Sequence, residues 1–252
     1  YVMSRAQERT RAAGLEEKVS GLMNGIASSV RNYLPSQNDL ELGALPNVGA
    51  SMPEIEHITL LALPRDGANT SVNYVWATND GDILRKIDTD EYIQGSSQYQ
   101  DATVAALTGR FAALNEEAQQ ALGAMSVQIG ELSAEGAALA LSTDEASRER
   151  LDAINSAVRL LTERSTATLN ALSAQASGAY PPFDTQKLDR TNTEYLFYKP
   201  VLYRQGSESM YVRALILMQV STENLLQTVD DSRRTLMYIA AVIALVRSEE
   251  HT

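Results

Sequence analysis

The sequence predicts an α+β fold with a long N-terminal helix, an antiparallel sheet interrupted by a long antiparallel helical hairpin, and a C-terminal helix. Three observations predict it. Apolar residues recur at three- and four-residue spacing near the N-terminus and again in the middle of the chain, which is the period of a helix. Short aromatic and β-branched segments bounded by Gly, Asn and Ser indicate strands. An unbroken apolar run, Leu236–Val246, lies near the C-terminus.

The chain is acidic and contains no cysteine. It has 252 residues, with 21 Lys and Arg against 32 Asp and Glu, a formal net charge of −11. That excess argues against a nucleic-acid partner, which binds a basic face, and against adhesion to anionic lipid through a basic patch. Without cysteine there is no disulfide framework and no thiolate chemistry, and cysteine usage does not decide the compartment.

Residues 1–35 are predicted to form one long helix. Its apolar stripe consists of Leu15, Val19, Leu22, Ile26, Val30 and Tyr33. Pro35 is expected to stop the helix because it has no N–H to donate and disfavours helix at the preceding residue.

Residues 36–96 are expected to hold the first half of the sheet. A loop with Pro46 and Gly49 as breakers covers residues 36–53, followed by strands at 54–63 and 71–77. Turns are expected at 64–67 and 79–82, and a short third strand at 83–87.

Residues 97–178 change character to a segment rich in Ala, Glu, Gln, Ser and Leu. Two apolar seams, Val104–Leu132 and Leu151–Leu172, predict two antiparallel helices of roughly 35–40 residues each. Ser142 is expected to cap the second helix, with Glu145 completing a capping box. Because strand signals resume at Thr193, the hairpin is interpreted as an insertion between two halves of one domain.

Residues 179–220 are expected to complete the sheet with two strands around the turn Arg204–Glu208. Ser221–Asn224 carries helix N-cap chemistry, so an exit helix is predicted over residues 221–246. A bilayer span needs roughly 20 apolar residues, more than Leu236–Val246 supplies. We therefore expect a truncated transmembrane segment and a non-native tail at 247–252, the alternative being a core helix of a soluble protein.

This order of elements resembles the extracytoplasmic Cache (PDC, PAS-like) sensor domains of bacterial transmembrane receptors. The segments that carry the resemblance are Val72–Asp80, Glu194–Pro200, and Met210–Val220 running into Ser221. The helical hairpin departs from the common pattern. The resemblance implies a small ligand, an amino acid, carboxylate or amine, bound between the sheet and the loops over it.

By position, the resemblance implies six ligand-binding residues: Tyr74, Trp76, Asp80, Tyr195, Tyr198 and Arg213. An Arg can fork onto a carboxylate, an Asp can accept from an ammonium, and aromatic walls exclude water. Each residue also has a purely structural interpretation. The aromatics can be sheet packing, Asp80 a turn former, and Arg213 an edge residue.

Catalytic chemistry finds little support in the sequence. The two histidines, His57 and His251, supply neither a triad nor a metal cluster, and no Gly-rich phosphate loop follows a strand. We therefore expect no enzyme activity, no metal and no cofactor.

The favoured interpretation is the periplasmic input domain of a membrane-anchored receptor, working as a parallel homodimer through the stripe on the N-terminal helix. A signal would shift the N-terminal and exit helices against each other. The alternative is a surface-exposed structural module that binds another protein through the helical hairpin.

Overall fold

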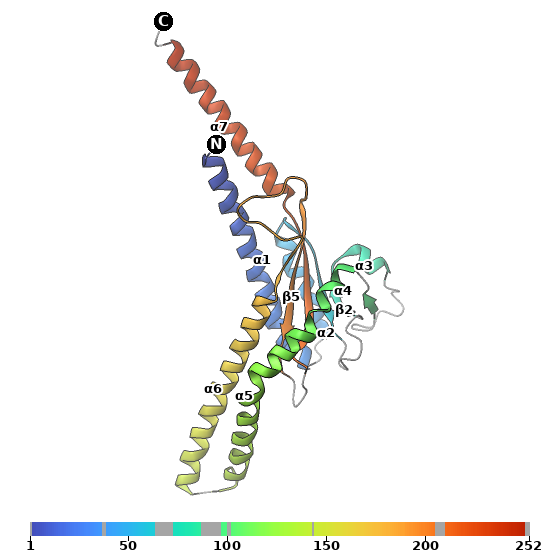
Figure 1. The fold of residues 1–252 in the computed structure, drawn as a ribbon, viewed down its shortest axis with the longest axis vertical. Coiled ribbons are helices and arrows are strands. Elements are labelled where there is room, and N and C mark those ends of the chain that lie inside the picture. The colour runs from blue at the N-terminus through green and yellow to red at the C-terminus, as the bar shows by residue number, and fades with distance from the viewer. Residues whose placement is uncertain are drawn as a thin grey trace.

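The structure, a computed structural model, describes residues 2–36, 39–63, 73–86, 97–99, 102–142, 144–204 and 210–249. Figure 1 shows the elements in chain order. They are α1 (Val2–Ser36), α2 (Asp39–Ala44), the 3₁₀ helix η1 (Leu45–Ser51), β1 (Ile55–Ala62), β2 (Asn73–Thr78), α3 (Gly81–Lys86), β3 (Ser97–Tyr99), α4 (Ala102–Thr108), α5 (Phe111–Leu139), α6 (Glu145–Gln175), β4 (Gly178–Tyr180), β5 (Glu194–Leu202), β6 (Val212–Ser221) and α7 (Glu223–Glu249).

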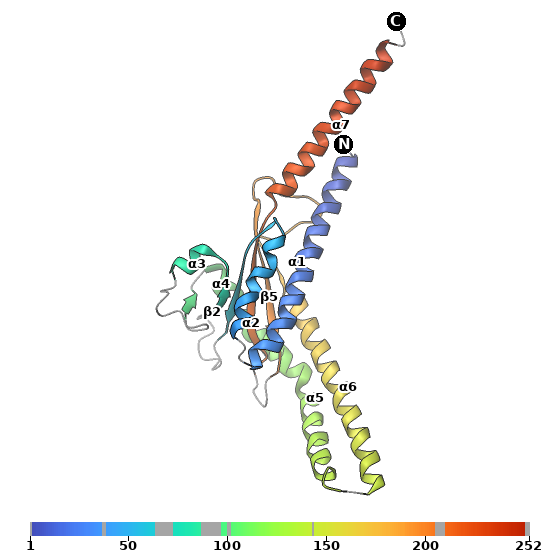
Figure 2. The same cartoon turned by 180° about the vertical axis from the view of Figure 1, so that it is seen from behind.

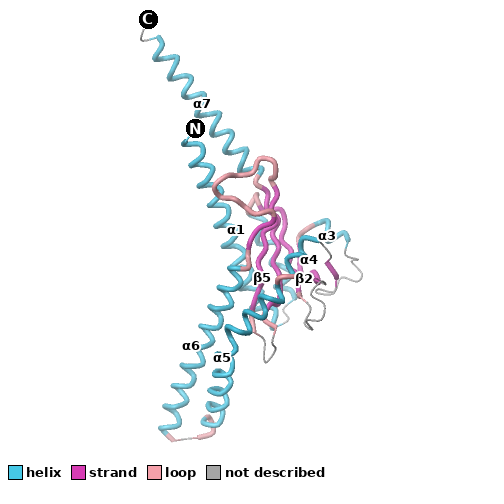
Figure 3. Tube along the Cα trace, in the orientation of Figure 1, coloured by secondary structure: helices cyan, strands magenta, loops and turns pink. Residues whose placement is uncertain are grey.

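The molecule is elongated, with the sheet in its middle. Seen from both sides, α1 runs along the sheet and projects beyond it together with α7, while α5 and α6 extend past the opposite end (Figures 1 and 2). The trace coloured by secondary structure shows the strands confined to the central part, between the two helical arms (Figure 3).

The described strands form one sheet in the order β3-β2-β1-β6-β5-β4, and every pair is antiparallel. The central pair joins β1, which precedes the long helices, to β6, which follows them, with Ile58 opposite Met218. Segments from before and after α5 and α6 thus share one sheet. The predicted α+β class, the antiparallel sheet and the long N-terminal helix are confirmed.

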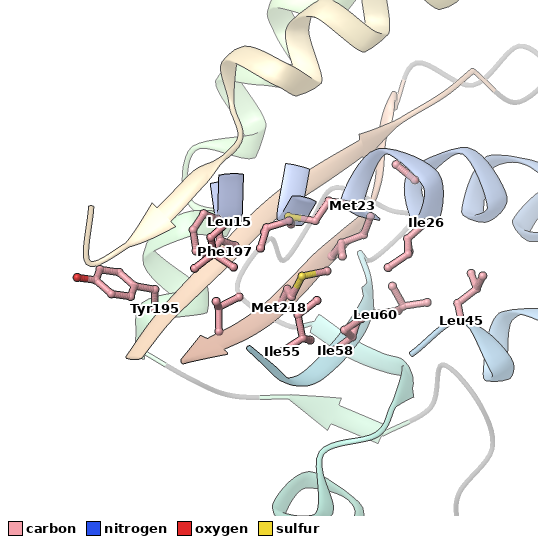
Figure 4. Close-up of a cluster of buried hydrophobic side chains, with 14 of the residues drawn as sticks. Leu15, Met23, Ile26, Leu45, Ile55, Ile58, Leu60, Tyr195, Phe197 and Met218 are labelled. Atoms are coloured by element: carbon pink, nitrogen blue, oxygen red, sulfur yellow. The ribbon is translucent and has the colours of Figure 1, made fainter. Parts of the chain in front are cut away.

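One face of the sheet packs on α1 (Figure 4). Leu15, Met23 and Ile26 of α1 are at most 4% exposed and belong to the same buried cluster as Phe197 of β5 and Met218 of β6. Most of the apolar stripe of α1 is therefore buried against the sheet of the same chain, with Leu22 and Tyr33 partly buried. A dimer through α1 would have to use the face that points away from the sheet.

The other face carries a second buried cluster. This cluster contains Leu215 and Leu217 of β6. Phe111 and Leu122 of α5 and Leu169 of α6 belong to it as well. Because β6 is covered on both faces, its side chains from Val212 to Met218 are all buried. This explains the nearly unbroken apolar run there, which is the pattern of a strand enclosed on both faces.

Helices α5 and α6 lie antiparallel and are bound to each other and to the sheet. Arg150 forks onto Glu135, with N–O distances of 2.7 and 3.1 Å. At the sheet end, the Ser173 hydroxyl donates to the carbonyl of Pro200 (2.6 Å), and Asn115 Oδ1 accepts from the backbone N–H of Tyr211 (2.6 Å). These bonds attach each helix to the strands β5 and β6.

The predicted loop at 36–53 and the predicted third strand at 83–87 were wrong. The former holds α2 and η1, because Leu42 and Leu45 are buried against the α1-side core, a tertiary effect that breaker residues do not reveal. The latter is largely α3, because the Asp80 carboxylate accepts from the N–H groups of Asp82 and Ile83 and so caps a helical turn.

Several boundaries also differ from the prediction. The first helix of the predicted hairpin is divided near Gly109 into α4 and α5. Helix α1 ends at Ser36, one residue past Pro35. The cap of α6 is Asp144, which accepts from Ser147 N–H (2.8 Å), while the Ser142 hydroxyl donates to Asp144 instead of capping. The short strand β4 was not predicted. The predicted turns at 64–67 and 204–208 lie largely outside the described residues.

Helix α7 agrees with the predicted exit helix. Its side chains from Leu236 to Ile243 are exposed, including Met237 at 64% and Tyr238 at 73%. Within the described part of the chain, no helix combines the length and the hydropathy needed to cross a membrane.

Candidate functional site

A cavity of about 260 Å³ lies on the sheet face opposite α1. Its floor follows one cross-strand row, because His57 of β1 pairs with Gln219 of β6, Gln219 with Leu196 of β5, and Leu196 with Tyr180 of β4. All four residues line the cavity. The remaining lining residues are Thr59, Asp80, Ile83, Thr103 and Leu217.

The turn between β2 and α3 fixes Asp80 at the rim of this cavity. Asn79 Oδ1 accepts from Ile58 N–H (2.7 Å), and Asn79 Nδ2 donates to the carbonyl of Pro46 (3.1 Å). The backbone N–H of Asp80 donates to the Thr78 hydroxyl (3.0 Å), which in turn bonds the Thr59 hydroxyl (2.8 Å). The turn is therefore held by β1 through Ile58 and Thr59 and by η1 through Pro46.

The Asp80 carboxylate serves two functions. One oxygen caps α3, with the N–H of Asp82 at 2.8 Å, and the other lies 3.5 Å from Nε2 of His57. The Asp80 side chain is 17% exposed and that of His57 is 35% exposed, so both are reachable from solvent. A carboxylate, an imidazole, a hydroxyl and the Gln219 amide around a small apolar floor suit a small polar ligand that carries hydrogen-bond donors.

The structure does not gather the six predicted ligand residues around one cavity. Only Asp80 lines the cavity of His57. Trp76 and Tyr195 pack in the α1-side cluster, where the Tyr195 ring meets Phe183 edge to face at 5.0 Å between centroids. Both aromatics therefore lie on the opposite face of the sheet, where Tyr195 also lines a separate cavity of about 850 Å³.

The other three predicted residues lie apart from the cavity as well. Tyr74 is partly buried on β2, opposite Ala62. Tyr198 lies on the cavity face but one row away, against Gly178 of β4. Arg213 is 6% exposed at an irregularity near the start of β6, with its guanidinium 5.7 Å from the Tyr203 ring centroid. Their assignment to a ligand site stays a prediction.

Sequence reasoning missed His57 and Gln219, which face each other across the central pair of strands. Gln219 interrupts an apolar run in β6 and is the available signal there, whereas His57 stands beside Glu56 in β1 and gives no such signal. What the sequence does not reveal is the register that brings the two together.

A second hollow of about 690 Å³ lies between α1 and the strands β4 and β5. Lys199 lines it and is only 7% exposed, and its ammonium donates to the Ser177 hydroxyl at 3.4 Å. Burial lowers the pKa of Lys199, and the positive charge of Arg31 lowers it further. Ser177 in turn donates to the carbonyl of Ser173 (2.6 Å), so this lysine supports the C-terminal end of α6.

Comparison with protein-family models, curated proteins and solved structures found no match to this chain. The fold and the cavity on the face opposite α1 are thus the observations that bear on function.

Proposed function

We propose that this chain is the extracytoplasmic sensing domain of a membrane-bound receptor, of the chemoreceptor, kinase, cyclase or phosphatase type. A small ligand that carries hydrogen-bond donors, an amine or an amino acid, binds in the cavity of His57 and Asp80. The observation that carries the proposal is continuity: β6 contributes Gln219 to the cavity floor and passes into α7 with only Thr222 between the two elements. We assign no catalytic role to the cavity.

The path from cavity to helix is short and hydrogen-bonded. Gln219 lies two residues before the end of β6 at Ser221, and the N–H of Thr222 donates to the carbonyl of Thr193 (2.8 Å). A ligand that binds Gln219 and shifts the end of β6 would move the first turn of α7 relative to α1. Such a shift requires that the ligand bind one arrangement of the helices more tightly than the other.

Membrane attachment through α7 is supported by its exposed side chains. Leu236, Met237, Tyr238, Ile239, Val242 and Ile243 are each between 46% and 73% exposed. This part of α7 is thus apolar around its whole circumference. Such a helix is usually enclosed by protein or by lipid. Lipid is the enclosure that a receptor requires.

Thermal unfolding against a panel of amino acids, amines and small carboxylates tests the ligand cavity. Asp80→Asn removes the charge but keeps an N-cap for α3, since Asn caps as well as Asp. The matched control is Asp82→Asn, whose carboxylate is exposed and does not line the cavity. We expect a compound that raises the Tm of the parent and of the control, but not that of Asp80→Asn, because selective binding to the folded state stabilises it. Equal shifts in all three proteins, or none with any compound, would contradict the cavity assignment.

A second candidate function is an interaction module that acts through α5 and α6. Large apolar side chains are exposed there, with Val127 at 62%, Leu160 at 65% and Leu141 at 90%. If these residues bind a protein or a second copy, replacing Val127 and Leu160 by Ser should abolish self-association in sedimentation velocity. A parent chain that sediments as a monomer at high concentration would rule out self-assembly through this arm.

A further inference from the structure

The loop between β4 and β5, residues 181–193, connects α1 to α7 at the end from which both helices project. The N–H of Leu188 donates to Glu8 Oε1 of α1 (3.1 Å), and Arg9 Nε donates to the carbonyl of Gln186 (3.4 Å). On the other side, Arg190 forks onto Asp230 of α7 with both N–O distances 2.9 Å. Three separate elements thus meet at this end of the molecule.

A cavity of about 850 Å³ lies at this junction and is rich in cations. Five cationic side chains line it, from α1 (Arg5, Arg9), the loop (Lys187, Arg190) and α7 (Arg233). Three carboxylates share the lining, and each accepts hydrogen bonds from the loop's own backbone: Glu8 from Leu188, Asp184 from Gln186 and Asp189 from Thr191. Five cations face three carboxylates in the lining, and Arg190 is already paired with Asp230 of α7, so a small excess of positive charge remains in a chain whose net charge is −11.

The position of this cavity along α7 identifies what it faces. Arg233 precedes Leu236, the first of the exposed apolar residues, by three positions, which is about 4.5 Å along a helix axis. If lipid encloses α7 from Leu236 onward, as in the proposed function on which this inference rests, the cavity lies at the depth of the lipid headgroups.

We propose that this cavity binds a phosphate group, supplied by the headgroup of an anionic phospholipid in the membrane that α7 enters. Guanidinium groups present paired N–H donors that match the oxygens of a phosphate. The net negative charge of the chain argues against a large basic surface patch. That argument does not exclude a single cavity at which cations from three elements converge. Bound there, a headgroup would contact α1, the loop and α7 together and fix their relative positions.

The test measures flotation of the chain with vesicles of phosphatidylcholine alone and with vesicles that contain phosphatidylglycerol, at constant ionic strength. Arg233→Gln removes a cation of the cavity. The matched control Arg234→Gln removes the same charge from the next residue, which does not line the cavity and lies 3.8 Å from Asp231. We expect Arg233→Gln to weaken binding to anionic vesicles about fivefold, the size of one cation at a membrane surface, with binding to neutral vesicles unchanged. Arg9→Gln should act in the same direction, and Arg234→Gln should have a clearly smaller effect.

Equal losses in Arg233→Gln and Arg234→Gln would overturn the proposal, because the effect would then be one of general charge. Binding to both vesicle types without preference would overturn it too, while leaving membrane attachment intact. Failure to bind either vesicle would overturn both the attachment and the headgroup site. Thermal unfolding in inorganic phosphate, against chloride at the same ionic strength, distinguishes the source of the phosphate. A phosphate effect that Arg233→Gln abolishes, without any lipid preference, would assign the cavity to a soluble anion and overturn the lipid assignment.

Discussion

Arg190 and Asp230 form a two-point ion pair, with each guanidinium Nη 2.9 Å from one carboxylate oxygen. Arg190 lies in the loop that leads into β5, and Asp230 lies two turns into α7. Together with the bond from Thr222 N–H to the Thr193 carbonyl, the pair fixes the direction in which α7 leaves the sheet. Movement of α7 therefore requires that this loop move with it or that the pair open.

Replacing Asp230 by Asn should loosen α7 and remove a pH-dependent contribution to stability. The hydrogen bond from Arg190 is the main cause that lowers the pKa of Asp230. Because the folded pKa lies below the unfolded one, the pair contributes fully at neutral pH and loses its contribution as the pH falls below about 4 and through the folded value. Both side chains are half exposed, so we expect a loss of only about 0.5–1 kcal/mol at pH 7 by urea unfolding.

Asp231→Asn is the control for this prediction, since Asp231 is 76% exposed and its contact to Arg234 is 3.8 Å. Amide hydrogen exchange over the first turns of α7 should accelerate in Asp230→Asn and stay unchanged in Asp231→Asn. Identical exchange in the two variants would show that the ion pair does not hold α7.

A second prediction concerns the start of α6. Hydrogen bonds from Ser142 and Ser147 lower the pKa of Asp144 to about 2. The cap therefore persists well below the usual range of an Asp carboxyl, and its contribution to stability is lost only as the pH falls from about 4 toward 2. The amide shift of Ser147, followed by NMR, should titrate with a midpoint near 2. In Ser142→Ala the midpoint should rise, because the largest cause is removed. A midpoint near 4 in the parent would contradict the capping geometry.

The elements with strong local patterns were predictable from the sequence, whereas the short ones were not. The stripe of α1 and the aromatic and apolar strands β5 and β6 repeat over enough residues to identify their type. Helices α2 and η1 depend on the burial of Leu42 and Leu45, and β4 has only three residues. Such segments take their structure from their neighbours, which a single sequence does not show.

The candidate site was harder to predict for a related reason. Aromatic residues in a strand indicate packing but not which face of the sheet they occupy, so Trp76 and Tyr195 fell on the α1 side. Ile83 of α3 and Thr103 of α4 line the cavity together with the strands, so it depends on the tertiary arrangement. Of the six residues that the resemblance implied, only Asp80 lines this cavity, and its role in binding a ligand stays a prediction.

The attachment of α6 to the sheet gives a third prediction. Ser173 is fully buried, and its hydroxyl donates to the Pro200 carbonyl at 2.6 Å. Ser173→Ala should lower the free energy of unfolding by about 1–3 kcal/mol, since the carbonyl loses a buried donor. Ser165→Ala is the matched control on the same helix, because the Ser165 hydroxyl makes a weak contact with the Met125 sulfur at 3.8 Å. Urea unfolding in which both variants lose the same stability would show that the bond to Pro200 contributes nothing specific.

The contact between Gly178 and Tyr198 gives the fourth prediction. A Cβ at position 178 would lie 2.9 Å from the Tyr198 hydroxyl oxygen and 3.2 Å from its Cζ, which is closer than a methyl group tolerates. Gly178→Ala should therefore destabilise the fold by about 1–3 kcal/mol, the usual cost of overpacking. Tyr198→Phe removes the nearer atom, so the double variant should recover a large part of that loss. A double-mutant cycle by thermal unfolding measures the coupling. Additive losses would show that the phenol moves aside at no cost and that Gly178 is not required for the close approach of β4 to β5.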